Sequence, residues 1–283
     1  MLQRLKNKYA TAESAGKAIN ALARISPIKA GKVGLELFCT PRKGRVLTAK
    51  EMRFIKGAEE TIALPFENYT LNMYRWGKGE RKLMLAHGYE SNTSRWRALV
   101  PLLVREGYEV VAFDAPAHGL SGGKTLNGVQ YANASQLIIE IEKPFAVIGH
   151  SLGAMSTAWY FQRIETMPIE KFIMLATPSK LRTVMNLFIE ALNLTPTAIT
   201  GLEKHFIQKI GFCIDDFTLE DYIKKCDVAG CIIHDRLDTI IPFSEAQAIH
   251  QSWQGSTLIE TNGLGHYLQS GDVYRKILTE LEK

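Results

Sequence analysis

The 283-residue chain contains little cysteine, and no stretch of it is apolar over the length of a transmembrane helix. Its four cysteines, Cys39, Cys213, Cys226 and Cys231, form no Cys-x-x-Cys pair. This number and spacing exclude the dense disulfide framework of a small secreted protein and favour thiols in a reducing compartment. The amino-terminal segment also lacks the apolar core of a signal peptide, so we expect a cytoplasmic protein.

Acidic residues are scarce in the first 56 positions, where 13 lysines and arginines accompany only Glu13, Glu36 and Glu51. The remaining residues carry a net negative charge, although the formal charge of the whole chain is +5. Aromatic residues do not alternate with these cations as they do in nucleic-acid binding motifs, so we expect no nucleic-acid partner. Peripheral contact of residues 1–56 with an anionic membrane is one interpretation, and packing against the body of the protein is the other.

An apolar stripe of helical spacing runs through this basic segment. Its members are Leu2, Leu5, Tyr9, Ala12, Gly16, Ile19 and Ala23. Ser26-Pro27 is expected to end the helix, and Gly31 to Phe38 to form a short second helix. The stripe contains no Trp or Phe to anchor it in lipid, which favours packing over membrane contact.

From residue 61 onward, short apolar runs alternate with segments of helical periodicity. The predicted strands are Thr61–Phe66, Tyr69–Trp76, Lys82–Ala86, Glu109–Phe113, Phe145–Ile148, Phe172–Ala176, Val228–Ile233 and Thr257–Glu260. The predicted helices are Thr93–Arg105, Asn127–Ile141, Leu152–Arg163, Ser244–Gln251 and Tyr267–Leu281. The first two strands are expected to be antiparallel. Apolar strands between helices indicate an α/β fold whose mostly parallel central sheet is covered by helices on both faces.

Three patterns of helical spacing interrupt this alternation after Thr177-Pro178. The second pattern begins at Thr195-Pro196, and Thr218 is the expected cap of the third. We expect this helical insertion to be a lid over a ligand pocket, and the alternative is that its helices complete the core. The predicted division of the chain is therefore a basic helical extension, a body, and a lid or cap insertion, at residues 1–60, 61–178 with 228–283, and 179–227.

The pentapeptide Gly149-His150-Ser151-Leu152-Gly153 follows an apolar strand and precedes a helical segment. A strand that turns into a helix within two residues needs a strained bend, and glycines on both sides remove the side chains that would clash there. The residue at the apex then projects its side chain outward. The sequence therefore predicts that Ser151 is a nucleophile.

A serine nucleophile needs a base, and the base needs an acid that fixes its tautomer. In parallel sheets such groups follow the carboxyl ends of strands. Asp238 comes shortly after the strand 228–233, and His266 lies in a glycine-containing loop after the last strand. Asp235 lies nearer to the strand end and is the alternative acid. The predicted catalytic residues are Ser151, Asp238 and His266.

The oxyanion that forms during acyl chemistry needs fixed N–H donors. The backbone amide of Leu152 is one candidate. The other is the amide of Tyr89, in the loop that follows the strand 82–86, where Gly88 permits an unusual turn and His87 is expected to support the loop. Gly88 is also predicted to bind substrate, together with Met185 and Phe188 of the insertion.

These motifs, with Phe113-Asp114-Ala115-Pro116-Ala117-His118-Gly119-Leu120-Ser121-Gly122, resemble those of the α/β-hydrolase superfamily over residues 61–283. The chain order Ser, Asp, His is the one that the resemblance implies, and Ile240-Ile241-Pro242 is similar to the segment after the acid in many relatives, which favours Asp238. Ala117 stands where relatives usually have Gly, and Asp235 where they usually read H-G. The basic extension resembles that of uncharacterised bacterial members and implies no substrate.

Together these features predict a serine hydrolase that cleaves an ester or thioester with an apolar acyl or alcohol part. Serine at the turn argues against a dehalogenase or an epoxide hydrolase, which the superfamily builds with aspartate there. No metal or organic cofactor is implied. Acyl transfer, amide cleavage, C–C bond hydrolysis and cofactor-free peroxidation use the same residues and are alternatives. A non-catalytic, membrane-associated binding protein is the alternative from another class, and the sequence does not indicate the oligomeric state.

Overall fold

The computed structural model describes residues 2–45, 47–161 and 168–283 of the chain and divides into two compact units. A helical unit contains the residues up to Thr40 together with Lys180–Thr218, and a sheet unit contains Pro41–Ser179 and Leu219–Lys283. The amino-terminal extension and most of the insertion thus belong to one unit. Residues 41–60 and 219–227, predicted to be parts of the extension and the insertion, belong to the sheet unit instead.

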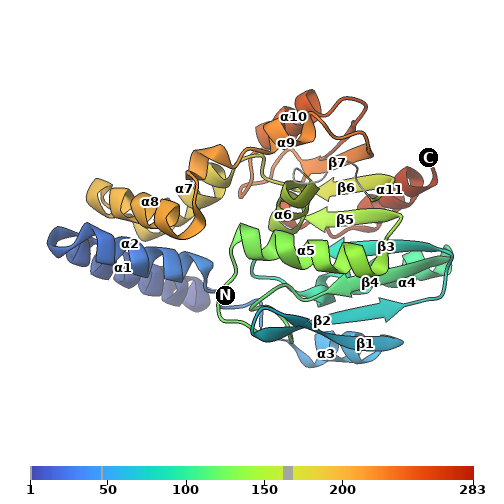
Figure 1. Cartoon of the computed structure of the whole chain (residues 1–283), viewed down its shortest axis with the longest axis horizontal. Coiled ribbons are helices and arrows are strands. Elements are labelled where there is room, and N and C mark those ends of the chain that lie inside the picture. The colour runs from blue at the N-terminus through green and yellow to red at the C-terminus, as the bar shows by residue number, and fades with distance from the viewer. Residues whose placement is uncertain (1, 46, 162–167) are drawn as a thin grey trace. The chain divides into compact units, whose positions relative to one another are not determined.

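The sheet unit is built on eight strands in the order β1-β2-β4-β3-β5-β6-β7-β8 (Figure 1). They are β1 (Glu60–Phe66), β2 (Tyr69–Trp76), β3 (Arg81–Ala86), β4 (Tyr108–Phe113), β5 (Ala146–His150), β6 (Lys171–Leu175), β7 (Ala229–Asp235) and β8 (Thr257–Thr261). β2 pairs antiparallel with both β1 and β4, and the other neighbours pair in parallel. All eight predicted strands are confirmed, with ends that shift by no more than two residues.

Helices cover both faces of this sheet. They are α3 (Ala49–Lys56), α4 (Val100–Arg105), α5 (Gly128–Glu142), α6 (Leu152–Phe161), α9 (Leu219–Ile223), α10 (Phe243–Ser252) and α11 (Gly271–Glu282). On one face, Leu103 of α4 and Ile277 of α11 share a core with Leu85 of β3. On the other face, the ring of Tyr131 on α5 lies 5.8 Å from that of Phe113 on β4. Every residue of the inner strand β5 is therefore buried, as expected for a parallel sheet between two helical layers.

Two predicted helices of the sheet unit differ from the structure because capping groups and a proline set other boundaries. The predicted helix Thr93–Arg105 is a 3₁₀ helix, η1 (Thr93–Ala98), followed by α4, which has Pro101 in its first turn. The predicted helix Tyr267–Leu281 is also divided, into the 3₁₀ turn η3 (Gly265–Tyr267) and α11. Ser270 caps α11 and accepts the N–H of Val273 at 3.2 Å, so the helix begins after it. The carboxyl end of the predicted helix Leu152–Arg163 lies outside the described residues.

The helical unit contains α1 (Leu2–Ile25), α2 (Pro27–Cys39), α7 (Leu181–Leu192), α8 (Pro196–Ile210) and the 3₁₀ turn η2 (Ile214–Asp216). As expected, α1 ends at Ser26-Pro27, and the Ser26 hydroxyl accepts the N–H of Lys29 at 3.4 Å. Glycines bring α2 and α8 into backbone contact, since a Cβ atom on Gly31 would lie 2.0 Å from the Gly201 carbonyl oxygen. The extension therefore packs against the insertion. Among the described helices, none combines the length and apolar character needed to cross a membrane.

The insertion begins and ends side by side in the helical unit. Lys180 and Thr218 form an antiparallel bridge, and the Leu181 amide donates to the Phe217 carbonyl at 3.1 Å. This paired stem lies in the connection between β6 and β7.

Candidate active site

Ser151 occupies the turn between β5 and α6 with a φ of +51°. A positive φ is uncommon for a residue other than glycine and stores strain. A Cβ atom on Gly149 would lie 2.5 Å from the Ala154 Cα atom, and one on Gly153 would lie 2.4 Å from the His87 carbonyl oxygen. Neither position can accept a side chain, so the two glycines permit the strand–turn–helix geometry that the sequence predicts.

The three predicted catalytic side chains lie together at the carboxyl end of the sheet. His266 Nε2 is 3.2 Å from Ser151 Oγ, and His266 Nδ1 is 2.8 Å from Asp238 Oδ2. The imidazole is 10% exposed, whereas the Asp238 side chain is fully buried. These distances form a continuous chain of hydrogen bonds from a hydroxyl through an imidazole to a carboxylate, which is the geometry of nucleophile activation.

Asp238 is held as a carboxylate by the groups around it. Its Oδ1 accepts the N–H groups of Ile240 at 2.8 Å and Ile241 at 3.0 Å, and His234 Nε2 lies 3.4 Å from Oδ2. Burial raises the pKa of Asp238, but the hydrogen bonds from His234 and His266 outweigh it and hold this pKa below the ordinary value of 3.8. An ionised Asp238 holds the proton of His266 on Nδ1 and leaves Nε2 free to accept the serine proton.

Asp235, the alternative acid, has other partners. Its carboxylate accepts the Thr261 hydroxyl at 2.7 Å and the Leu264 amide at 2.9 Å, together with two further amides. These bonds join the end of β7 to the loop that carries His266. Asp235 therefore supports that loop, whereas the only aspartate that contacts the His266 ring among the described residues is Asp238.

Two buried side chains hold the backbone of the His266 loop. His150 Nε2 donates to the His266 carbonyl at 2.9 Å, and the Arg95 guanidinium donates to the Tyr267 carbonyl at 2.8 Å. Burial, together with the charge of Arg95, holds the pKa of His150 well below its usual range, so this ring is neutral. Burial also lowers the pKa of Arg95, to about 9. Nothing in the local sequence around Arg95 indicates this contact with a loop far along the chain.

The loop after β3 runs alongside the nucleophile. A Cβ atom on Gly88 would lie 3.2 Å from the Ser151 Cβ atom. His87 is buried, its Nδ1–H donates to the Gly88 carbonyl at 2.8 Å, and its Nε2 accepts the Ala115 amide at 3.0 Å. His87 thus supports the loop, as predicted. Tyr89 directly follows Gly88 in the chain, and Leu152 directly follows Ser151. Their backbone amides stay the predicted oxyanion donors.

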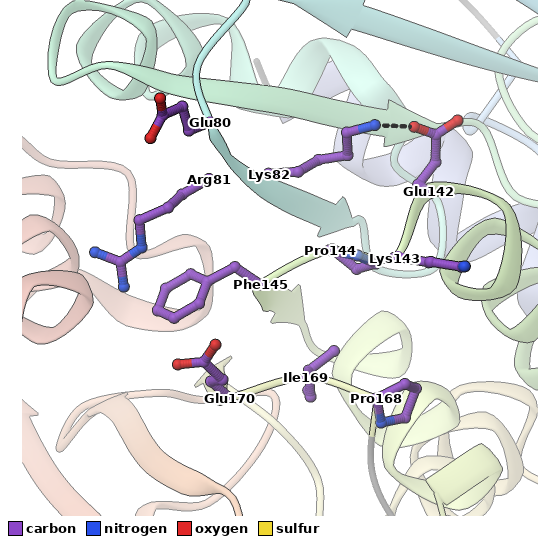
Figure 2. Close-up of a pocket in the computed structure, with 10 residues that line it drawn as sticks. All are labelled: Glu80, Arg81, Lys82, Glu142, Lys143, Pro144, Phe145, Pro168, Ile169 and Glu170. Atoms are coloured by element: carbon purple, nitrogen blue, oxygen red, sulfur yellow. Dashed lines mark hydrogen bonds and ion pairs between the residues drawn. The ribbon is translucent and has the colours of Figure 1, made fainter.

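A cavity of about 710 Å³ lies at the opposite ends of the strands (Figure 2). It is lined by the start of β3, the end of α5 and the residues that precede β5 and β6, and the Arg81 guanidinium lies 3.6 Å from the centre of the Phe145 ring. Lys82 at its edge pairs with Glu142 at 2.7 Å. Because Ser151 follows the carboxyl end of β5, this cavity is separate from the three catalytic candidates.

Comparison with known proteins agrees with this fold. Residues 82–197 match a family model for the alpha/beta hydrolase fold. The chain has the α/β-hydrolase fold. Solved structures agree across most of the chain: the esterase Pf2001 of Pyrococcus furiosus aligns with a TM-score of 0.63 at 20% identity, over 86% of this chain and 96% of that one. The bromoperoxidase of Bacillus anthracis aligns with a TM-score of 0.62 at 17% identity, over 79% and 100%.

Curated relatives match this chain over shorter segments than the solved structures do. The serine hydrolase-like protein of Danio rerio is 31% identical over 110 residues, which are 36% of this chain and 33% of that protein. The human serine hydrolase-like protein is 30% identical over 129 residues, which are 43% and 61% of the two chains. The matched segments span between 22% and 61% of the lengths of the curated relatives.

The predicted substrate contacts of the insertion lie on α7 in the helical unit. They are Met185 and Phe188. Met185 is buried, and the Phe188 ring meets that of Phe38 edge to face at 5.2 Å. The lid function of the insertion and the substrate contacts of these two residues stay predictions.

The buried histidines of this α/β-hydrolase-fold protein make its stability depend on pH. Burial lowers the pKa values of His87 and His118 from 6.5 to about 4, and both rings act as neutral donors and acceptors in loop contacts. The unfolded chain therefore binds more protons than the folded one between pH 6.5 and 4. The free energy of unfolding consequently decreases as the pH is lowered through that window. We expect each histidine to cost about 2 kcal/mol of unfolding free energy between pH 7 and 5. Urea unfolding at both pH values measures this, and a His118→Asn variant should lose about 2 kcal/mol less than wild type between them. An unfolding free energy that is equal at both pH values would contradict it.

Proposed function

We propose that this protein is a serine hydrolase that cleaves a carboxylic ester or thioester with an apolar acyl or alcohol part. The observation that carries the proposal is the contact of His266 with both Ser151 Oγ, at 3.2 Å, and Asp238, at 2.8 Å. A serine hydroxyl becomes an effective nucleophile only when a base can take its proton, and this arrangement supplies that base in the required tautomer.

In the proposed reaction, Ser151 Oγ attacks the substrate carbonyl carbon while its proton passes to His266 Nε2. The amides of Tyr89 and Leu152 stabilise the oxyanion that forms. The tetrahedral intermediate then collapses, the alcohol or thiol leaves with the proton of His266, and the acyl group stays on Ser151. Water, deprotonated by His266, hydrolyses this acyl-enzyme and restores the free serine.

Several of the similar proteins are named for ester or thioester hydrolysis, and others are named for the alternative reactions. Solved structures similar to this chain include an esterase, a monoacylglycerol lipase and a thioesterase domain. They also include a bromoperoxidase, and a proline iminopeptidase is among the curated relatives. These structures are at most 20% identical to this chain, so the likeness supports the fold and the reaction is argued from the side chains.

A fluorophosphonate probe tests the nucleophile. We expect one covalent adduct, located by mass spectrometry on the peptide that contains Ser151. Chromogenic esters of graded acyl length, with matched thioesters and amides, then define the substrate class, and added alcohols or amines reveal acyl transfer. An adduct on another serine, or none, would contradict the proposal.

A second candidate function is docking on an anionic membrane, and the bend between α1 and α2 favours it. Ile25 is 86% exposed and Ile28 is 56% exposed at this bend. Neither isoleucine belongs to the predicted apolar stripe. Two members of that stripe, Ile19 and Ala23, are buried. Three exposed cations surround the bend: Arg24, Lys29 and Lys32. Apolar side chains flanked by cations are the composition that binds anionic bilayers.

Vesicle binding tests this second candidate. We expect the protein to bind vesicles of phosphatidylcholine with phosphatidylserine, and binding to weaken as salt screens the charges. The Ile25→Ser/Ile28→Ser double variant should bind about tenfold more weakly or worse, because it loses the apolar groups that enter the bilayer. Ile141→Ser, which changes an exposed isoleucine of the sheet unit, is the matched control. Equal binding by the double variant and wild type, or no binding at all, would exclude the candidate.

A further inference from the structure

Residues Pro41–Arg45, here called the strap, run across the loop that carries the proposed oxyanion donor Tyr89. The Glu90 carboxylate receives two backbone groups of the strap: the Arg42 amide, at 3.0 and 3.1 Å from its two oxygens, and the Lys43 amide. A carboxylate that accepts successive backbone N–H groups makes charge-assisted bonds, which are stronger than neutral ones. Glu90 thereby ties the loop after β3 to a segment that lies far before it in the sequence.

Gly44 fixes the other side of the strap. Its carbonyl accepts the Gly119 amide at 2.8 Å and the Asn92 side chain at 3.3 Å. A Cβ atom on Gly44 would lie 2.1 Å from the His118 ring, so the backbone of the strap rests directly on that imidazole. The Arg45 guanidinium also donates to the carbonyl of Gly123. The strap is therefore bonded to the loops on both sides of it.

The backbone at Glu90 is strained and needs such support. Its φ of +56° lies in the left-handed region, which costs a residue other than glycine free energy. The Glu90 amide donates to His118 Nε2 at 3.2 Å. Side chain and backbone of Glu90 are thus both held, one by the strap and the other by the imidazole on which the strap rests.

The direction of the Tyr89 N–H follows from these contacts. In a planar trans peptide the N–H points opposite to the preceding carbonyl. His87 holds the Gly88 carbonyl at 2.8 Å, which sets the plane of the Gly88–Tyr89 peptide from one side. Glu90 fixes the backbone on the other side of Tyr89. A donor aimed in advance at a developing oxyanion stabilises it far better than one that must reorient.

We propose that Glu90 and the strap are positioning groups that hold the Tyr89 amide toward the oxyanion, so that residues 41–45 contribute to the active site. This proposal rests on the proposed hydrolase function. Neither Glu90 nor the strap contributes an atom to the reaction. They act on the stabilisation of the transition state, so their loss should lower kcat and leave KM nearly unchanged.

The Glu90→Gly variant separates the tether from the backbone conformation. Glycine adopts a positive φ without strain, so this variant removes the carboxylate without adding backbone strain, and the control below accounts for the freedom that glycine adds. We expect kcat for a chromogenic ester, per active site titrated with the fluorophosphonate probe, to fall by about tenfold to 100-fold with little change in KM. Glu90→Gln, whose side-chain oxygen can still accept from the strap, should recover much of the loss. Glu67→Gly is the matched control, because Glu67 also has a positive φ, +49°, in the turn between β1 and β2.

Amide hydrogen exchange of the peptide that contains residues 88–90 supplies a readout independent of turnover. We expect faster exchange in Glu90→Gly and in Gly44→Ala, whose new methyl group displaces the strap from His118. Unchanged exchange, or a kcat of Glu90→Gly within about twofold of wild type, would overturn the proposal. Wild-type protein without turnover or labelling would instead contradict the hydrolase function, and the exchange result would still decide whether the strap holds the loop.

Discussion

We expect the Ser151→Ala variant to hydrolyse esters with a kcat about 10⁵-fold below that of wild type and to take up no fluorophosphonate. Without Oγ the acyl-enzyme cannot form, and the remaining turnover is direct attack by water assisted by the oxyanion donors. The side chain of Ser151 makes its described contact only with His266, so its removal should leave the unfolding free energy almost unchanged. Steady-state kinetics, labelling and urea unfolding of the same preparation measure the three quantities.

A double variant provides the control for the effect of Ser151→Ala, because the effects of two residues that act together do not add. Because Ser151 and His266 act as one unit, the Ser151→Ala/His266→Gln double variant should be no slower than Ser151→Ala alone. A double variant that loses a further large factor would mean that His266 serves another nucleophile. Retention of turnover by Ser151→Ala within about tenfold of wild type would reject Ser151 itself.

The second large effect is expected at Asp238. Asparagine in this position cannot hold the proton of His266 on Nδ1, so the base presents the wrong tautomer to Ser151, and kcat should fall by about 10⁴-fold. Asp235→Asn is the comparison that identifies the acid. Its carboxylate bonds to Thr261 and Leu264 rather than to His266, so its loss should mainly lower the unfolding free energy, by about 1–3 kcal/mol.

Measurement of kcat and unfolding free energy for both asparagine variants therefore gives opposite patterns. Asp238→Asn should lose turnover with a small loss of stability, and Asp235→Asn should lose stability with a kcat reduced by less than about tenfold. Loss of ester turnover in Asp235→Asn but not in Asp238→Asn would reverse the choice of acid.

The sequence predicts those features that depend on local periodicity or on a motif whose parts are adjacent. The strand β5, the turn at Ser151 and the glycines beside it are consecutive residues, so their geometry can be deduced from the residue types. The positions of Asp238 and His266 follow from parallel strands, because such strands bring their carboxyl ends to one edge. The helix α3 is not among the predicted helices, although its capping box, Thr48 with Glu51, is a local signal that the sequence contains.

Contacts between distant segments have no such signature. Arg95 and Tyr267 are 172 positions apart, and Arg42 and Glu90 are 48 apart. Each pair joins a side chain to a backbone group, and backbone groups are the same for every residue type, so the sequence carries no complementary partner to recognise. The close approach of Gly31 and Gly201 is hidden for the same reason. The joint unit formed by the extension and the insertion could therefore be found only in the folded structure.

The bridge between Lys180 and Thr218 makes the segment enclosed by it an exchangeable module. Two paired residues are separated by about 5 Å across a ladder, so the ends of a replacement must meet at this spacing, and its surface must also pack closely against α2, as Gly201 does. Exchange of the module leaves the pairing of β6 with β7 in place, and with it the spacing between the turn that bears Ser151 and the loop that bears Asp238. A new segment can therefore be joined at this one stem without a change in the strands that precede Ser151 and Asp238.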